Sequence, residues 1–160
     1  MNNPLAVYLQ DHLAGSVQAI QLVEFLRDQH PNQALGRFAE AMLIEIKADQ
    51  ETLRSVSERV GNGASEVKEL AAWIAEKLTR LKLRAEDETS LGTFEALEFL
   101  ELGIHGKWAL WRALHEIAAS DARLGAIDFK RLAARAEAQR AEVEDRRLEL
   151  ARTALLSPQS

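Results

Sequence analysis

Apolar residues recur at intervals of three and four through every long segment of this chain, and no segment sustains an alternation with a period of two. Intervals of three and four are the period of an α-helix, whereas half-buried strands alternate at every second residue. Glycine, proline and charged residues separate the periodic segments, as expected for loops between helices. We therefore predict an all-α fold with helices near residues 5–28, 33–60, 65–84, 90–119 and 128–155.

The lengths of the predicted helices indicate how they are connected. Four of them span about 24 to 30 residues, roughly 36 to 45 Å at about 1.5 Å per residue, and the third is shorter. An up-down pair, a long connection that carries the short helix, and a second up-down pair form a four-helix bundle with one long crossover. Since 160 residues suit one domain with one core, we expect residues 1–160 to form a single domain.

The composition excludes several classes of function. The chain has no cysteine, which excludes disulfides, thiolate metal sites and a cysteine nucleophile. Its formal net charge of -5 makes a general attraction to nucleic acid unexpected. The sequence shows neither a nucleophile elbow nor a phosphate-binding glycine loop. Because it also has no membrane-length apolar run and no leader pattern, we expect a soluble, cytoplasmic protein that binds neither nucleic acid nor membrane.

Several polar residues fall on the predicted apolar faces of the helices. A projection at about 100° per residue places His12 on the apolar face of the first helix, and Glu45 and Asp49 at or within that of the second. The apolar seam of the last helix contains Arg140 and Arg147. An unpaired buried charge is very costly, so these side chains need partners. We predict that they form a buried charge network.

The fourth predicted helix is apolar around most of its circumference. Its polar residues, among them Glu98, Glu101 and His105, are confined to a narrow stripe. This pattern favours burial on several sides, with the stripe facing solvent or an interface. The interface candidates are Glu101, His105, Trp108 and Trp111, although tryptophan more often packs in a core or between helices.

Two runs of residues, together with the predicted topology, resemble the ferritin-like superfamily, in particular small bacterial members with stress-related or unassigned roles. The runs are YLQDH at residues 8–12 and IEIKADQETL at residues 44–53. In metal-binding members the first and third bundle helices each supply a carboxylate. The second and fourth each supply a glutamate followed three residues later by a histidine. The resemblance implies a four-helix bundle with a di-iron or di-manganese site between its helices.

The first two helices carry this ligand pattern in part. His12 stands at the position of the first-helix carboxylate, unless that role is displaced to Asp11. Glu45 matches the second-helix glutamate. The residue three positions later is Ala48, which leaves Asp49 as the substitute for the histidine.

The last two bundle helices also match in part. Glu95 or Glu98 would supply the third carboxylate, and Glu137 the glutamate of the final pair. Arg140 stands where the final histidine is expected. A guanidinium remains protonated and has no lone pair to give to a metal.

Three hypotheses of function follow from these patterns. The first is a non-catalytic ferritin-like bundle with a structural, interaction or stress-related role, whose ancestral metal centre has been remodelled into the buried charge network. The second is an iron or manganese oxidoreductase that oxidises and stores iron or acts on oxygen or peroxide. Its metal ligands would be His12, Glu45, Asp49, Glu98 and Glu137. The third is a bundle whose fourth-helix stripe binds a protein partner. Apart from this stripe, the wide apolar arcs of several helices suit a homodimer interface.

Overall fold

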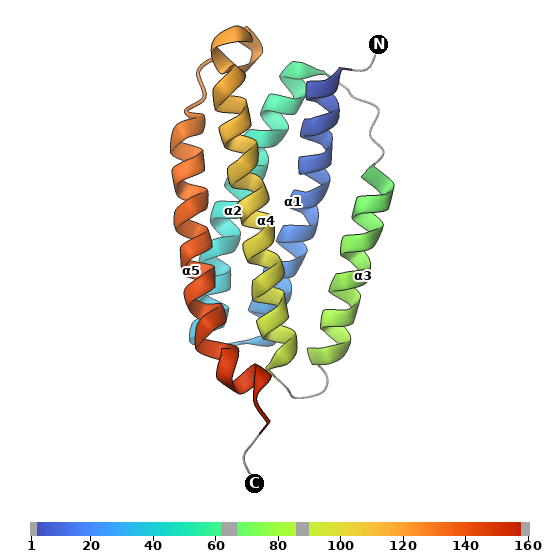
Figure 1. The fold of residues 1–160 in the computed structure, drawn as a ribbon, viewed down its shortest axis with the longest axis vertical. Helices are drawn as coiled ribbons and strands as arrows, with labels where there is room; N and C mark the ends of the chain where they lie inside the picture. Colours follow the sequence, from blue (N-terminus) through green and yellow to red (C-terminus); the bar gives the residue numbers. More distant parts are fainter. Residues whose placement is uncertain (1–2, 62–66, 86–89, 158–160) are drawn as a thin grey trace.

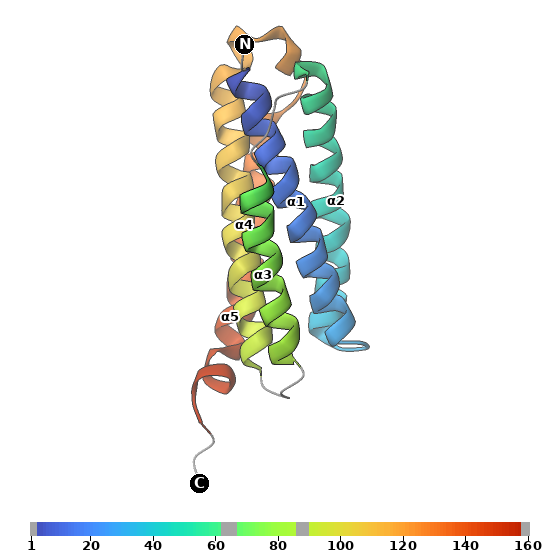
Figure 2. The ribbon, with the colours of Figure 1, turned by 90° about the vertical axis from the view of Figure 1, so that its right-hand side faces the viewer.

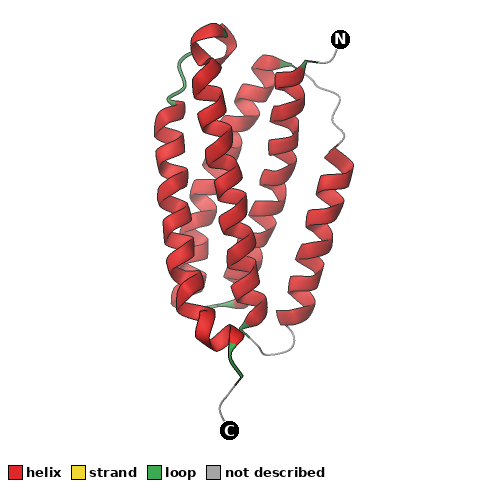
Figure 3. Ribbon diagram, viewed as in Figure 1, coloured by secondary structure: helices red, strands yellow, loops and turns green. Residues whose placement is uncertain are grey.

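The computed structural model describes residues 3–61, 67–85 and 90–157, and within these ranges all regular secondary structure is helical (Figure 3). The predicted all-α class is therefore confirmed. The five α-helices are α1 (Pro4–Gln29), α2 (Ala34–Val60), α3 (Val67–Ala85), α4 (Leu91–Ile117) and α5 (Phe129–Leu155). Two short 3-10 helices connect α4 to α5, η1 (Ala118–Ser120) and η2 (Ala122–Leu124).

The ends of these helices lie within a few residues of the predicted ones. The side chain of Asn3 caps α1 by accepting a hydrogen bond from the backbone N–H of Ala6 at 3.3 Å. Asp128 caps α5 in the same way, with the N–H of Arg131 at 3.0 Å. Such caps satisfy backbone donors that have no partner inside the helix. The predicted start of the third helix, at residue 65, lies outside the described residues.

The four longest helices form two antiparallel hairpins, α1 with α2 and α4 with α5 (Figure 1). The two hairpins lie side by side. The helix α3 runs along α1 and α4 (Figure 2), at the edge of the bundle away from α5 (Figure 1). It returns the chain from the end of the bundle where α2 finishes to the end where α4 begins, which is the position expected for the crossover helix.

The turn between α1 and α2 is held by a close backbone approach. Asn32 adopts a left-handed conformation with a φ of 60°, which asparagine tolerates better than most residues. Gly36, in the first turn of α2, packs directly against this turn. A Cβ at that position would lie 2.0 Å from the carbonyl oxygen of His30. Only glycine therefore lets the two helices meet so closely here.

The core lies between the two hairpins and receives apolar side chains from all five helices. Trp111 of α4 stacks on Phe129 of α5 with ring centroids 6.0 Å apart, and both rings are buried. Each large apolar side chain buried in this way contributes about 1.5–3 kcal/mol to stability. Within the described ranges, no helix combines the length and apolar character needed to cross a bilayer.

Candidate functional site

Five polar side chains meet between α2, α4 and α5, and we call them the polar network. Two of them are buried (Asp49 and Gln139), two are partly buried (Lys107 and Arg135), and Glu45 is exposed at its edge. At its centre is Asp49 of α2. The ammonium of Lys107 on α4 donates to Asp49 Oδ2 at 2.6 Å, and the guanidinium of Arg135 on α5 donates to Asp49 Oδ1. Lys107 Nζ also donates to Gln139 Oε1 at 2.5 Å, and Gln139 Nε2 donates to Glu45 Oε2 at 2.6 Å. The network therefore connects three helices.

The spacing of residues on two helices explains why these side chains meet. Glu45 and Asp49 lie four apart on α2, and Arg135 and Gln139 lie four apart on α5. Residues four apart project from the same face of a helix, so each helix presents two polar groups to the other. Lys107 reaches between them from α4. Gln139 can bridge because its amide both donates and accepts hydrogen bonds.

Burial makes this pairing energetically important. Asp49 is only 3% exposed, and the side chain of Lys107 is 15% exposed. Burial lowers the pKa of Lys107, and the adjacent carboxylate of Asp49 opposes that effect. With Arg135 as a second cation and Glu45 as a second carboxylate, the formal charges balance. An isolated charge at this depth would be strongly destabilising.

The structure brings only part of the predicted charge network together. Asp49 is buried in the polar network, as predicted. Glu45 joins the network through Gln139 but is exposed, so its predicted burial is wrong. Arg140 instead lies 3.6 Å from a carboxylate oxygen of Glu101, and its side chain is 45% exposed. Arg147 lies 3.1 Å from Glu98 and 2.7 Å from Glu144. The two arginines therefore pair with carboxylates at the side of the α4–α5 hairpin.

Sequence reasoning missed Lys107, Arg135 and Gln139. The apolar seam of α5 includes Ala136 and Val143, and both Gln139 and Arg140 lie three or four residues from each of them. The helical period therefore allowed either residue to face inward, and packing places Gln139 there with 2% exposure. The only sequence signal was the position of Arg135 and Gln139 one turn apart.

His12 is half-buried on α1 and lies apart from the polar network. Its ring meets the ring of Tyr8 edge to face, with centroids 4.7 Å apart. Burial lowers the pKa of His12, and the nearby charge of Asp11 raises it by a smaller amount. The neutral imidazole is therefore favoured. Its place is in the lining of a cavity that also reaches Asp49 and Lys107.

The predicted stripe on α4 divides into two environments. Glu98 and Glu101 pair with arginines of α5. His105 is exposed and stacks on the half-buried ring of Trp108, with centroids 5.1 Å apart. Trp111 is fully buried, so it is a core residue and cannot form part of an outer interface.

The proposed metal ligands do not converge in the structure. In residues 3–61, 67–85 and 90–157, no group of three or more histidine, aspartate or glutamate side chains is arranged to share a metal ion. Of the five predicted ligands, Glu45 and Asp49 lie in the polar network, whereas His12 and Glu98 have other neighbours and Glu137 is exposed on α5. The side-chain arrangement thus gives the di-metal hypothesis no support.

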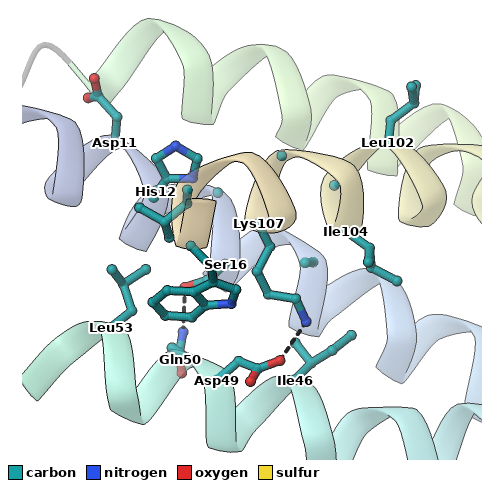
Figure 4. Close-up of a pocket in the computed structure, with 16 residues that line it drawn as sticks. Asp11, His12, Ser16, Ile46, Asp49, Gln50, Leu53, Leu102, Ile104 and Lys107 are labelled. Atoms are coloured by element: carbon teal, nitrogen blue, oxygen red, sulfur yellow. Dashed lines mark hydrogen bonds and ion pairs between the residues drawn. The ribbon is translucent and has the colours of Figure 1, made fainter. Parts of the chain in front are cut away.

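A cavity of about 400 Å³ lies beside the polar network, between α1, α2 and α4. Lys107 extends from α4 across this region to Asp49 on α2 (Figure 4). Next to Asp49 on α2, Gln50 Nε2 donates to Ser16 Oγ at 3.0 Å, which joins α2 to α1. The remaining walls are largely aliphatic. The cavity volume falls within the range of about 300–1,000 Å³ found for small-molecule sites.

The fold and site together define an all-helical bundle with a charge-balanced polar network centred on the buried Asp49, and an adjacent apolar cavity. Comparisons with family models, curated proteins and solved structures find no match for this chain.

Proposed function

We propose that this chain is a non-catalytic, ferritin-like bundle in which ion pairs between its own side chains take the interior place of a di-metal centre. Its role is structural or interacting. The arrangement of two antiparallel hairpins, with a returning helix between them in sequence, supports the ferritin-like part of this proposal. The polar network supports the non-catalytic part.

The neutralisation of Asp49 carries the proposal. In a di-metal carboxylate protein, bound cations neutralise the interior carboxylates. In this chain Lys107 and Arg135 already bind the two oxygens of Asp49, one each. A metal ion would have to displace a cation from a carboxylate that is almost completely buried. Such a displacement leaves a buried charge without its partner, which is costly.

Metal analysis of the purified protein tests this proposal. The protein would be equilibrated with ferrous or manganous ion, dialysed, and analysed for both elements. We expect far less than one ion per chain. Binding of one or two ions per chain, lost in Glu45→Ala but kept in Glu51→Ala, would contradict the proposal and favour the di-metal alternative. Glu51 is a suitable control because it is an exposed carboxylate on the same helix.

A further inference from the structure

Two apolar cavities adjoin each other along α1 and α4. The first is the cavity of about 400 Å³ beside the polar network, and the second, of about 270 Å³, lies between α1, α3 and α4. Both are lined by Gly15, Ala19, Leu102 and Gly103. The two cavities thus adjoin each other at these four residues, and we call them the cavity pair.

Glycines leave this space open. A Cβ built on Gly15, Gly103 or Gly106 would meet no other atom within 4 Å, although all three line the first cavity. Gly103 is exposed and Gly15 and Gly106 are half-buried, so the space beside them is a hollow open to solvent that no described side chain fills. Glycine also disfavours a helix by about 1 kcal/mol relative to alanine. Close contact with other parts of the chain therefore does not explain why glycine occupies these three positions.

A buried donor without a partner lines the first cavity. Trp111 is fully buried, and its indole Nε1 has no hydrogen-bond partner among the described residues. In the second cavity, the side-chain oxygen Oε1 of Gln18 is likewise buried and unpartnered. Buried polar groups nearly always have partners, so each such atom calls for an explanation. An indole N–H can only donate, so its missing partner is an acceptor.

The charges around the first cavity indicate what kind of acceptor fits. Lys107, the cation in the lining of this cavity, is already paired with Asp49, as is Arg135. Asp11 and Asp49 both line the cavity, and burial favours the neutral form of His12. Lys77 lines the second cavity, where its ammonium lies 5.5 Å from the centroid of the Trp73 ring. An anionic group placed beside Trp111 in the first cavity would therefore find no free cation among the groups named for that cavity and would face two carboxylates. A neutral acceptor avoids that repulsion.

We propose that the cavity pair binds a neutral, mainly aliphatic small molecule that carries one carbonyl oxygen, and that this oxygen accepts a hydrogen bond from Trp111 Nε1. The aliphatic body lies against Ile46, Leu53, Leu102 and Leu110 and extends past Gly15 toward the second cavity. This binding function goes beyond the ion-paired scaffold and does not depend on it.

Three nine-carbon probes test the proposal: 2-nonanone, nonane and nonanoate. The readout is the indole N–H resonance of Trp111 in a proton–nitrogen NMR spectrum, where the three tryptophans give three such signals. The signal lost in Trp111→Phe identifies Trp111. We expect 2-nonanone to move this resonance and to bind about tenfold more tightly than nonane, the difference that one hydrogen bond contributes. We expect nonanoate to bind no better than nonane.

Two variants keep the test independent of how Trp111→Phe folds. Gly15→Leu places an aliphatic side chain in the open space shared by both cavities and should abolish binding of 2-nonanone. Gln21→Leu adds the same side chain at an exposed position of α1 outside both cavities and should leave binding unchanged. The proposal is overturned if 2-nonanone leaves the Trp111 resonance in place, if Gly15→Leu binds it as well as the unmodified protein, or if nonanoate binds most tightly.

Discussion

The two sides of α4 differ in their contacts and in how completely they are packed. Toward α5, Lys107 enters a polar network in which Asp49 and Gln139 accept its hydrogen bonds. Toward α3, Gly103 faces open space, and Leu102 lines both cavities. One side is filled and fixes the helices by directional contacts, whereas the other is apolar and unfilled. A helical bundle can therefore combine one half that is fixed by directional polar contacts with another half that has room for a second molecule.

The largest expected loss of stability comes from removing Asp49, the residue at the centre of the polar network. Asp49→Ala leaves the ammonium of Lys107 buried without its carboxylate, and we expect a loss of about 3–5 kcal/mol in the free energy of unfolding. Chemical denaturation measures this loss. The control is Glu51→Ala, which removes an exposed ion pair with Arg54 and should cost less than about 1 kcal/mol. Equal effects of the two substitutions would show that Asp49 does not hold the bundle.

A smaller loss is expected when the bridging amide is removed. Gln139→Leu keeps the volume of a side chain that is 2% exposed but deprives Lys107 and Glu45 of a partner. The unfolding free energy should fall by about 1–3 kcal/mol. Glu137→Leu, at an exposed site on the same helix, provides the matched control. If both variants melt at the same temperature as the unmodified protein, the bridge seen in the structure is not energetically significant.

On the unfilled side, substitution should stabilise the protein. Gly106→Ala places a methyl group in open space and improves helix propensity, so we expect a gain of about 0.5–1 kcal/mol in the free energy of unfolding. Gly36→Ala is the contrasting case, because its Cβ would collide with the carbonyl oxygen of His30 and should destabilise the fold. The comparison between the two sides fails if Gly106→Ala destabilises the protein in thermal melts.

Arg140, at the edge of the α4–α5 hairpin, should contribute little to the free energy of unfolding. Sequence reasoning placed Arg140 among buried carboxylates, which predicts a large loss for Arg140→Leu. The structure places it in a partly exposed pair with Glu101, and such pairs contribute about 0.2–1 kcal/mol. Denaturation of Arg140→Leu beside Asp49→Ala separates the two expectations. A loss of several kcal/mol for Arg140→Leu would mean that the arginine faces inward after all.

The smallest expected effect is the pH dependence contributed by His12. Because burial lowers its pKa in the folded protein, the unfolded chain takes up the proton at a higher pH. Acidification below the unfolded pKa of about 6.5 therefore favours unfolding, and stability should decrease from pH 7.5 to pH 5.5. In His12→Gln this decrease should be smaller, as measured by denaturation at the two pH values. A steeper loss of stability between these pH values in His12→Gln would contradict a lowered pKa for His12 in the folded protein.

Local sequence determined the helices and most of their limits. The helical period is a short-range property, and caps such as Asp128 act on the N–H groups of the next few residues. The inward position of Asp49 also followed from its own helix, because it falls within the apolar stripe of α2. These predictions needed no knowledge of the partner helices.

The tertiary structure decided which groups meet across helices. Gln139 and Arg140 are neighbours in sequence, and a rotation of about 100° around the axis of α5 exchanges their places. Only packing of α5 against α4 and α2 makes Gln139 the inner residue and leaves Arg140 at the edge. The same holds for Trp111, whose N–H is unpartnered because of what surrounds it. The centre of a helix's apolar face can be predicted from that helix alone, as for Asp49. Residues at the border of that face, and the partners of all of them, depend on how separate helices pack.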